Sequence, residues 1–242
     1  MNASFAELAN VATPMGVLSL RRRREPMRKV DVYEVKLGDE FLMSSLFTAG
    51  EVALAKLGLD MLDRTSLDVV VGGLGLGYTA RAVLEDPRVE SLLVVEALSH
   101  VIDWHTNGLL PETHALVGDS RCHIVCDDFF GMVRGDEALW PEAPGQQVDA
   151  ILVDIDHTPS HLLNASHTDF YTPQGMERLA RDLRPGGVFG LWSDALPDEE
   201  FLDILGTVFV DVRAEVVAFP NFYTGGESSN TVYLGRRRDE YQ

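Results

Sequence analysis

The segment Val69-Val70-Val71-Gly72-Gly73-Leu74-Gly75-Leu76-Gly77-Tyr78-Thr79 decides the fold. Its valines indicate a buried strand, and the glycines that follow predict a tight turn into a helix that begins near Tyr78. Glycine adopts positive φ and lets a ligand approach the backbone closely, so Gly73, Gly75 and Gly77 are candidate ligand-binding positions. A strand, a glycine-rich turn and a helix in this order predict a nucleotide-type site.

From residue 51 onward, buried strands alternate with helices. The expected strands are 68–71, 91–96, 123–126, 149–154 and 188–192, and the expected helices are 51–62, 78–85, 99–107, 174–183 and 199–205. Strands that are apolar throughout indicate a parallel sheet covered on both faces. Two late strands, 208–217 and 231–234, suit an antiparallel hairpin, with 220–227 as a link between strands. We therefore predict an α/β fold with a Rossmann-like, doubly wound, mostly parallel seven-stranded sheet and an antiparallel edge.

Residues 1–50 follow another pattern. Short strands are expected at 16–22, 30–36 and 41–43. In the later region, a break is expected at 184–187, between the helix 174–183 and the strand 188–192. We predict a small N-terminal β-hairpin region over 1–50 and a Rossmann-like domain over 51–242. The basic run at 21–24 is expected at the solvated end of a hairpin.

Charge and composition exclude several classes of function. The 242 residues include 20 basic and 38 acidic side chains, a formal net charge of -18, which argues against a broad nucleic-acid or anionic-membrane partner. No apolar run approaches the roughly 20 residues of a membrane helix, and no secretory signal is evident. Cys122 and Cys126 lack a partner pair for zinc, so no metal site is expected. We expect a cytoplasmic protein, and its exposed edge strand favours a homodimer.

Acidic residues close three successive strands of the predicted sheet. Glu96 ends the strand after the glycine turn, where an acid typically accepts hydrogen bonds from ribose hydroxyls. Asp127 and Asp128 follow the third strand, where a carboxylate can accept from an adenine amino group, and Asp154 closes the fourth. Each acid alone would also suit a helix N-cap. Their joint placement with the glycine turn favours a nucleoside-type ligand at the carboxyl edge of the sheet.

Residues 68–192 resemble the class I S-adenosylmethionine fold, and specifically its spermidine synthase branch. The segments that carry the resemblance are 71–79, 94–96, 149–154, 170–172 and 183–187. The N-terminal strands resemble the small β-domain that precedes the sheet in aminopropyltransferases. The resemblance implies S-adenosylmethionine, or its decarboxylated form, as the cofactor of the glycine turn and the acids that follow it.

Three departures from the family bear on the reaction. Spermidine synthases carry an aspartate inside the glycine turn that helps to hold the amino end of the propyl group, and Leu76 stands at that place. Their catalytic loop reads Asp-x-x-Asp-Pro, and here Asp156 and His157 both compete for the second acidic position. The family's Tyr-His-Glu segment is also replaced, by residues 44–51.

Group transfer from a sulfonium is a nucleophilic displacement that requires alignment and removal of a proton from the acceptor. The resemblance implies that Asp154 grips the amino acid end of the cofactor or the acceptor amine. Asp156 or His157 would be the base, and Tyr171 would orient the acceptor.

Because Leu76 removes a marker of aminopropyl transfer, methyl transfer to a small-molecule acceptor, possibly an amine in class, is the first prediction. Aminopropyl transfer from decarboxylated S-adenosylmethionine to a polyamine is the alternative. A non-catalytic nucleoside-binding protein is a further alternative. A nicotinamide-dependent dehydrogenase is disfavoured, because its turn usually reads Gly-x-Gly-x-x-Gly.

Overall fold

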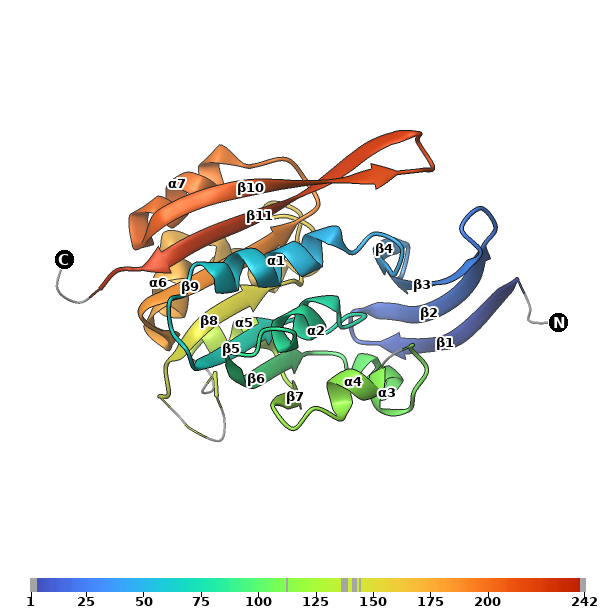
Figure 1. Cartoon of the computed structure of the whole chain (residues 1–242), viewed down its shortest axis with the longest axis horizontal. Coiled ribbons are helices and arrows are strands. Elements are labelled where there is room, and N and C mark those ends of the chain that lie inside the picture. Colours follow the sequence, from blue (N-terminus) through green and yellow to red (C-terminus); the bar gives the residue numbers. More distant parts are fainter. Residues whose placement is uncertain (1–3, 112, 136–138, 141–142, 144, 240–242) are drawn as a thin grey trace.

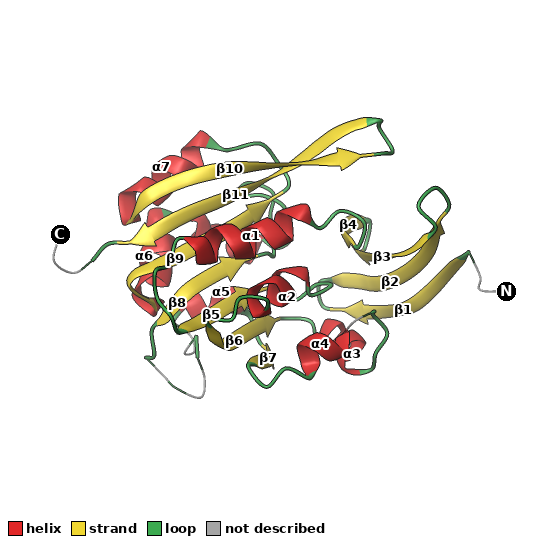
Figure 2. Cartoon of the chain, viewed as in Figure 1, coloured by secondary structure: helices red, strands yellow, loops and turns green. Residues whose placement is uncertain are grey.

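The computed structural model describes residues 4–111, 113–135, 139–140, 143 and 145–239. Two β-sheets lie end to end, and helices cover both faces of the larger one (Figures 1 and 2). The smaller sheet has the order β1-β2-β3-β4 and is antiparallel throughout. Its strands are β1 (Phe5–Thr13), β2 (Gly16–Glu25), β3 (Val30–Leu37) and β4 (Glu40–Ser44).

Strand β1 was not expected from the sequence. A register shift between Glu7 and Ala9 in its pairing with β2 interrupts the alternation of inward and outward side chains. Such a bulge removes the period of two on which the recognition of a strand depends. The basic run at 21–24 lies within β2, and Arg21, Arg23 and Arg24 pair with acids on the neighbouring strands, as Arg23 does with Glu34.

The larger sheet has the order β10-β11-β9-β8-β5-β6-β7. Its strands are β5 (Leu67–Gly72), β6 (Val89–Glu96), β7 (Cys122–Cys126), β8 (Val148–Val153), β9 (Leu183–Ser193), β10 (Phe209–Asn221) and β11 (Gly226–Arg237). The strands from β5 to β9 are mutually parallel, whereas β10 and β11 form an antiparallel hairpin at one edge. This confirms the predicted seven-stranded, doubly wound fold.

Apolar cores lie on both faces of this sheet. Val69 and Val71 belong to the core under α1 and α2, whereas Val70 belongs to the core on the opposite face. The helices are α1 (Ala49–Asp60), α2 (Tyr78–Leu84), α3 (Ser99–Thr106), α4 (Thr113–Val117), α5 (Phe129–Arg134), the 3-10 helix η1 (Ala165–Tyr171), α6 (Pro173–Asp182) and α7 (Glu199–Val208). Burial on both faces explains why the strand is apolar at every position.

The strands at this edge differ in length from the prediction. The expected break at 184–187 is part of β9, where Gly186 has a φ of +74° and the pairing with β8 shifts register between Val148 and Ala150. The positive φ of Gly186 accommodates this irregularity, so that β9 begins at Leu183 although its regular pairing with β8 starts only at Val188. The hairpin of β10 and β11 is also longer than expected, so that both strands extend into the segment 220–227 and only 222–225 form the turn that links them.

The N-terminal sheet and the β10–β11 hairpin meet beyond the carboxyl ends of the parallel strands (Figure 1). Arg23 donates a hydrogen bond to the Tyr223 hydroxyl at 2.9 Å, and the Arg28 guanidinium lies 4.4 Å from the centre of the Phe222 ring. Phe47 packs against the same hairpin, with its ring 5.5 Å from that of Phe219. These contacts close one side of the space above the sheet. Within the described part of the chain, no helix is long and apolar enough to span a membrane.

Candidate active site

The glycine turn joins β5 to α2 and requires glycine at its candidate positions. Gly73, Gly75 and Gly77 have φ values of +94°, +48° and +85°. A Cβ atom at Gly73 would collide with the carbonyl oxygen of Asp154, and one at Gly77 would lie 3.0 Å from the His105 ring. The turn therefore needs glycine both for its backbone conformation and for close packing.

Glu96 fixes this turn from the end of β6. Its carboxylate accepts hydrogen bonds from the backbone N–H groups of Leu74 at 3.0 Å and Leu98 at 2.9 Å. Burial raises the pKa of Glu96, and these backbone donors oppose that shift. His105 supports the turn from below, because its Nε2 lies 2.8 Å from the Gly75 carbonyl oxygen. No sequence pattern indicates this role of His105, since the residue occupies an ordinary position in helix α3.

The two aspartates after β7 differ in their surroundings. Asp128 lines the cavity described below and accepts a hydrogen bond from the backbone N–H of Phe130 at 3.0 Å, which caps α5. Asp127 does not line the cavity, and its carboxylate accepts from the backbone N–H of Asp128 at 2.7 Å. Only Asp128 has its side chain at the cavity, although the roles predicted for both residues remain predictions.

Asp154 and Glu51 form a pair of carboxyls at the centre of the site. Asp154 follows β8 and accepts a hydrogen bond from the Thr79 hydroxyl at 2.7 Å. Glu51 lies in the first turn of α1, is 5% exposed, and its Oε2 has no hydrogen-bond partner among the described residues. Burial, with the nearby charge of Asp154, raises the pKa of Glu51 to about 8, and burial raises the pKa of Asp154 to about 6.

The two candidates for the base lie in different environments. Asp156 is 1% exposed and accepts hydrogen bonds from the backbone N–H of Leu163 at 2.7 Å and the Tyr171 hydroxyl at 2.9 Å. It also lies 2.9 Å from Nδ1 of His167. Neither Asp156 nor Tyr171 lines the cavity. Both side chains thus belong to a buried network that fixes η1 beneath the loop.

His157 does line the cavity. Its Nδ1 lies 3.3 Å from Oδ2 of Asp194, which follows β9, and the backbone N–H of Asp194 donates to the His157 carbonyl at 2.9 Å. The His161 ring stacks on the outer side of the His157 ring at 4.8 Å between centroids. An imidazole held by a carboxylate at the wall of a cavity can accept a proton from a bound ligand.

A single cavity of 310 Å³ joins these groups. Its acidic wall, at the carboxyl edge of the sheet and the start of α1, carries Glu51, Glu96, Asp128, Asp154 and Asp194. Its apolar wall comes from the N-terminal sheet and the β10–β11 hairpin and includes Leu18, Val35, Leu37, Met43, Phe47 and Phe219. None of the described residues that line the cavity is Lys or Arg. Nor do the described residues include a cluster of His, Cys, Asp or Glu arranged to hold a metal ion.

Met43 connects the two walls, and this contact was not foreseen. Its sulfur accepts from the backbone N–H of Leu76 at 3.1 Å and covers Gly75. The Leu76 side chain, in turn, is 7% exposed and packs in the core rather than at the cavity. The place where the family carries an aspartate therefore offers the cavity no charge here.

Comparisons with known proteins agree with this geometry. The family model of the spermine/spermidine synthase domain matches residues 53–227. Proteins described as polyamine aminopropyltransferases from Mycobacterium tuberculosis and Mycobacterium bovis are 31% identical over 121 residues, which is 50% of this chain and 21% of each relative. The aligned part thus spans about a fifth of the length of these curated relatives.

Solved structures show the same fold. The spermidine synthase from Thermotoga maritima superposes with a TM-score of 0.72 at 17% identity, covering 95% of this chain and 72% of that one. A spermidine synthase in complex with the transition-state analogue AdoDATO has a TM-score of 0.73 at 16% identity and covers 95% of this chain and 73% of that one. With a family match over most of its length and this shared architecture, the chain belongs to the spermine/spermidine synthase domain family.

Proposed function

We propose that the chain transfers the aminopropyl group of decarboxylated S-adenosylmethionine to an amine acceptor. The observation that carries this proposal is the absence of Lys and Arg among the described cavity-lining residues, next to the carboxyls of Glu51 and Asp154. The carboxylate of S-adenosylmethionine would meet like charge there without a cationic partner. The decarboxylated form brings only positive charge, from its sulfonium and its amine. The family and the names of its relatives support aminopropyl transfer over methyl transfer.

The residues present fit this substrate. The glycine turn, Glu96 and Asp128 offer backbone and carboxylate partners to the nucleoside. Glu51 has a buried carboxyl oxygen without a partner, which suits an ammonium group at the place where Leu76 supplies no charge. The loss of the aspartate inside the turn, which favoured methyl transfer in the sequence, is thus offset by Glu51.

In the reaction, the acceptor nitrogen attacks the propyl carbon bound to the sulfonium. The C–N bond forms as the C–S bond breaks, and the bonding electron pair returns to sulfur to give neutral methylthioadenosine. The nitrogen must lose a proton, and we assign its acceptor to His157, held by Asp194, rather than to the enclosed Asp156. Asp154 orients the amine. A homodimer and a cytoplasmic location remain predictions.

A binding series followed by an assay tests the proposal. Calorimetry should rank decarboxylated S-adenosylmethionine and methylthioadenosine above S-adenosylmethionine, S-adenosylhomocysteine and NAD. Methylthioadenosine should then be released when an amine is added. Tighter binding of the carboxylated cofactors would contradict the proposal, and binding without release would indicate a non-catalytic nucleoside-binding protein. Glu96→Ala should weaken methylthioadenosine binding at least about tenfold, whereas Glu96→Gln keeps one acceptor oxygen and should lose less.

A further inference from the structure

The two walls of the cavity specify the chemistry of the acceptor. We propose that it is a primary amine with one charged head and an apolar alkyl or aryl tail, and not a linear diamine. This inference rests on the proposed transfer, and it concerns where the part of the acceptor beyond its reacting nitrogen lies. The head would face Asp154 and His157, and the tail would lie along the apolar wall.

A diamine would need a carboxylate for its second ammonium, and the acidic wall has few to offer. The carboxylate of Glu96 is engaged by two backbone N–H groups, and that of Asp128 caps α5. Glu51 and Asp154 lie together where the amine of the donor and the reacting nitrogen must be held. Asp194, the remaining lining carboxylate, has its Oδ2 3.3 Å from Nδ1 of His157 and belongs to the acidic wall, so it lies beside the reacting head and not along the tail.

The apolar wall offers a second ammonium no acceptor of negative charge. The polar residues that the N-terminal sheet and the hairpin bring to the cavity are Ser44 and Asn230, both neutral. The Ser44 hydroxyl already accepts from the backbone N–H of Leu46 at 3.2 Å. Trp192, beside Asn230, presents a buried Nε1–H that has no partner among the residues the structure describes, and an indole N–H only donates.

Burial of an ammonium group against the apolar wall costs desolvation free energy, and no ion pair offsets this cost there. An alkyl or aryl tail, in contrast, gains free energy by leaving water and contacting Leu37, Met43 and Phe219. The thioether of Met43 adds an adaptable, polarisable surface at the junction of the two walls. The same cavity therefore favours a cation at one end and disfavours it at the other.

The test uses the full chain with decarboxylated S-adenosylmethionine and four primary amines. Release of methylthioadenosine is measured with n-hexylamine, 2-phenylethylamine, 1,4-diaminobutane and 1,5-diaminopentane. The kcat/KM of the monoamines should exceed that of the diamines by about tenfold or more. Equal values, or a preference for the diamines, would overturn the proposal.

A binding arm separates this inference from the proposed function. n-Hexylamine and 1,4-diaminobutane are titrated calorimetrically into the free chain. If no amine supports release but n-hexylamine binds more tightly, the transfer proposal fails and the inference about the cavity stands. Tighter binding of 1,4-diaminobutane, or binding of neither amine, would overturn the inference.

Asn230→Asp adds a carboxylate to the apolar wall with almost no change in shape. It should shift the ratio of diamine to monoamine kcat/KM about tenfold toward the diamine. Asn107→Asp, the same change at an exposed position after α3 that does not line the cavity, is the matched control and should leave the ratio unchanged. An unchanged ratio in Asn230→Asp would contradict the placement of the tail.

Discussion

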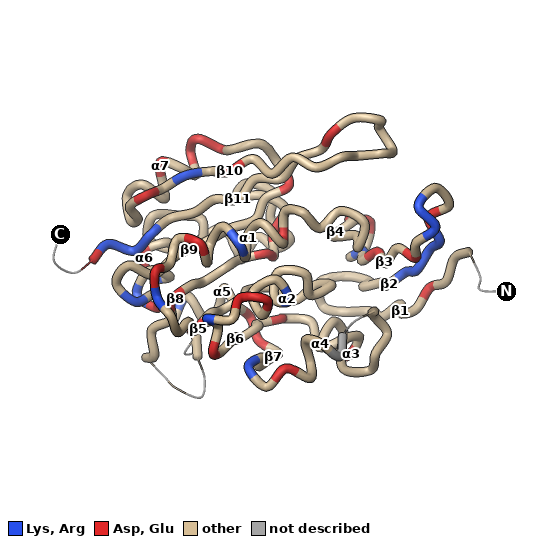
Figure 3. The backbone as a smooth tube through the Cα atoms, viewed as in Figure 1, with Lys and Arg blue, Asp and Glu red and all other residues tan. Residues whose placement is uncertain are grey.

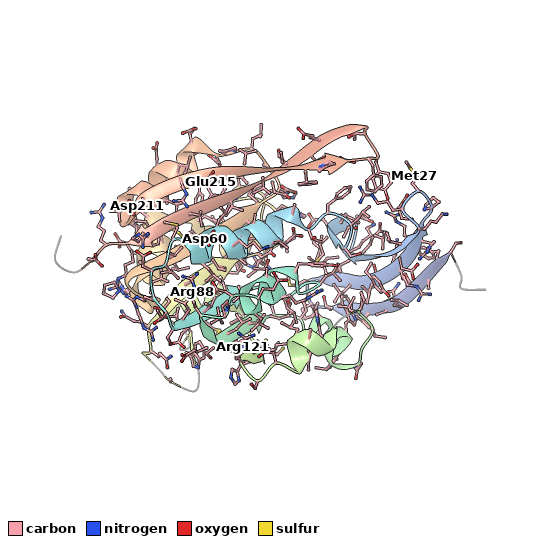
Figure 4. The ribbon with its side chains drawn as sticks, in the orientation of Figure 1. Met27, Asp60, Arg88, Arg121, Asp211 and Glu215 are labelled. Atoms are coloured by element: carbon pink, nitrogen blue, oxygen red, sulfur yellow. The ribbon has the colours of Figure 1, made fainter. Side chains whose placement is uncertain are left out.

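The carboxylates at the two edges of the parallel sheet differ in whether arginines neutralise them. At the amino edge, acids are matched with arginines: Asp149, which is fully buried, accepts from Arg64 at 2.7 Å and also pairs with Arg184. Arg88 and Arg121, labelled in Figure 4, lie away from the N-terminal sheet and donate to acids and to backbone carbonyls. Figure 3 shows basic segments near the C-terminus, on the side of the amino edge, and a separate basic segment along β2 at the opposite end of the molecule.

The direction of the pKa shifts follows this difference. At the amino edge, hydrogen bonds from Arg88 and Arg121 lower the pKa values of Asp86 and Asp119. Asp182, at the end of α6, is an exception at this edge, because burial raises its pKa to about 6 against the opposing charges of Arg181 and Arg237. At the carboxyl edge, burial without an arginine partner raises the pKa of Asp154 to about 6. The acids that pair with arginines at the amino edge therefore stabilise the fold. At the carboxyl edge, burial of the ionised acids costs free energy, and binding of a cationic ligand can offset this cost.

The same substitution, Asp to Asn, at both ends of β8 tests whether the two edges differ in function, and it has the largest expected effect. Asp154→Asn should lower the rate of transfer about 1000-fold with the fold intact, because a neutral amide cannot hold an ammonium group. Asp149→Asn should instead destabilise the fold by about 2–3 kcal/mol, because it weakens the charge-assisted hydrogen bonds that Arg64 and Arg184 donate to this buried carboxylate.

Initial rates and urea unfolding of both variants measure these effects. The folded fraction of Asp149→Asn should keep the rate of the unchanged chain. A large loss of stability in Asp154→Asn, with a rate loss in Asp149→Asn, would show that the two edges do not differ in function.

Within the carboxyl edge, substitutions of His157 and Asp156 test which of the two accepts the proton. His157→Asn should lower kcat/KM about 100-fold, because the imidazole at the cavity no longer takes the proton of the acceptor. The limb of the pH–rate profile that falls as an imidazole gains its proton should disappear as well. His161→Asn is the control, since its exposed ring stacks on His157 and lies 3.7 Å from Oε1 of Glu40 but does not line the cavity.

Asp156→Asn should lose stability and keep this limb of the profile, since Asp156 lies in the buried network with Tyr171. If Asp156→Asn removed the limb and His157→Asn did not, the assignment of the base would be reversed.

The parts of the site that could be predicted are those carried by short segments. The glycine turn and Glu96 follow from a strand, a turn and the next strand end, so their places are set locally. The sequence does not decide between Asp156 and His157 as the base, because the packing of η1 against the loop determines which of them is enclosed. Such packing brings together residues distant in sequence, which no local pattern reports.

Glu51 and Asp194 were missed for a related reason. Glu51 lies in the first turn of a helix, where an acid is favoured by the helix dipole alone. Asp194 follows β9 and reaches His157 only through the parallel pairing of β8 with β9. The apolar wall depends on where the N-terminal sheet docks, which the alternation of its strands does not specify.

The smallest expected effect concerns the dependence of stability on pH. Because the pKa of Glu51 rises to about 8 on folding, the folded chain holds a proton between about pH 5 and pH 8 that the unfolded chain releases. The free energy of unfolding should therefore fall as the pH rises through this window, by up to about 1.4 kcal/mol per pH unit from this group. Glu51→Gln has no proton to lose, so its urea-unfolding free energy should fall less steeply and exceed that of the unchanged chain near pH 8.

Glu90→Gln, at an exposed position in β6, is the matched control and should keep the slope of the unchanged chain. Saturation with an amine should also reverse the effect of pH, because an ammonium group beside Glu51 favours its ionised form. Binding should then release a proton near pH 7, which calorimetry in buffers of different ionisation enthalpy detects. Equal slopes for Glu51→Gln and the unchanged chain, with no proton released on binding, would mean that Glu51 is already ionised. The acidic wall would then hold its carboxyls in the ionised form without a ligand, as the amino edge does, and the proposed difference between the two edges would be wrong.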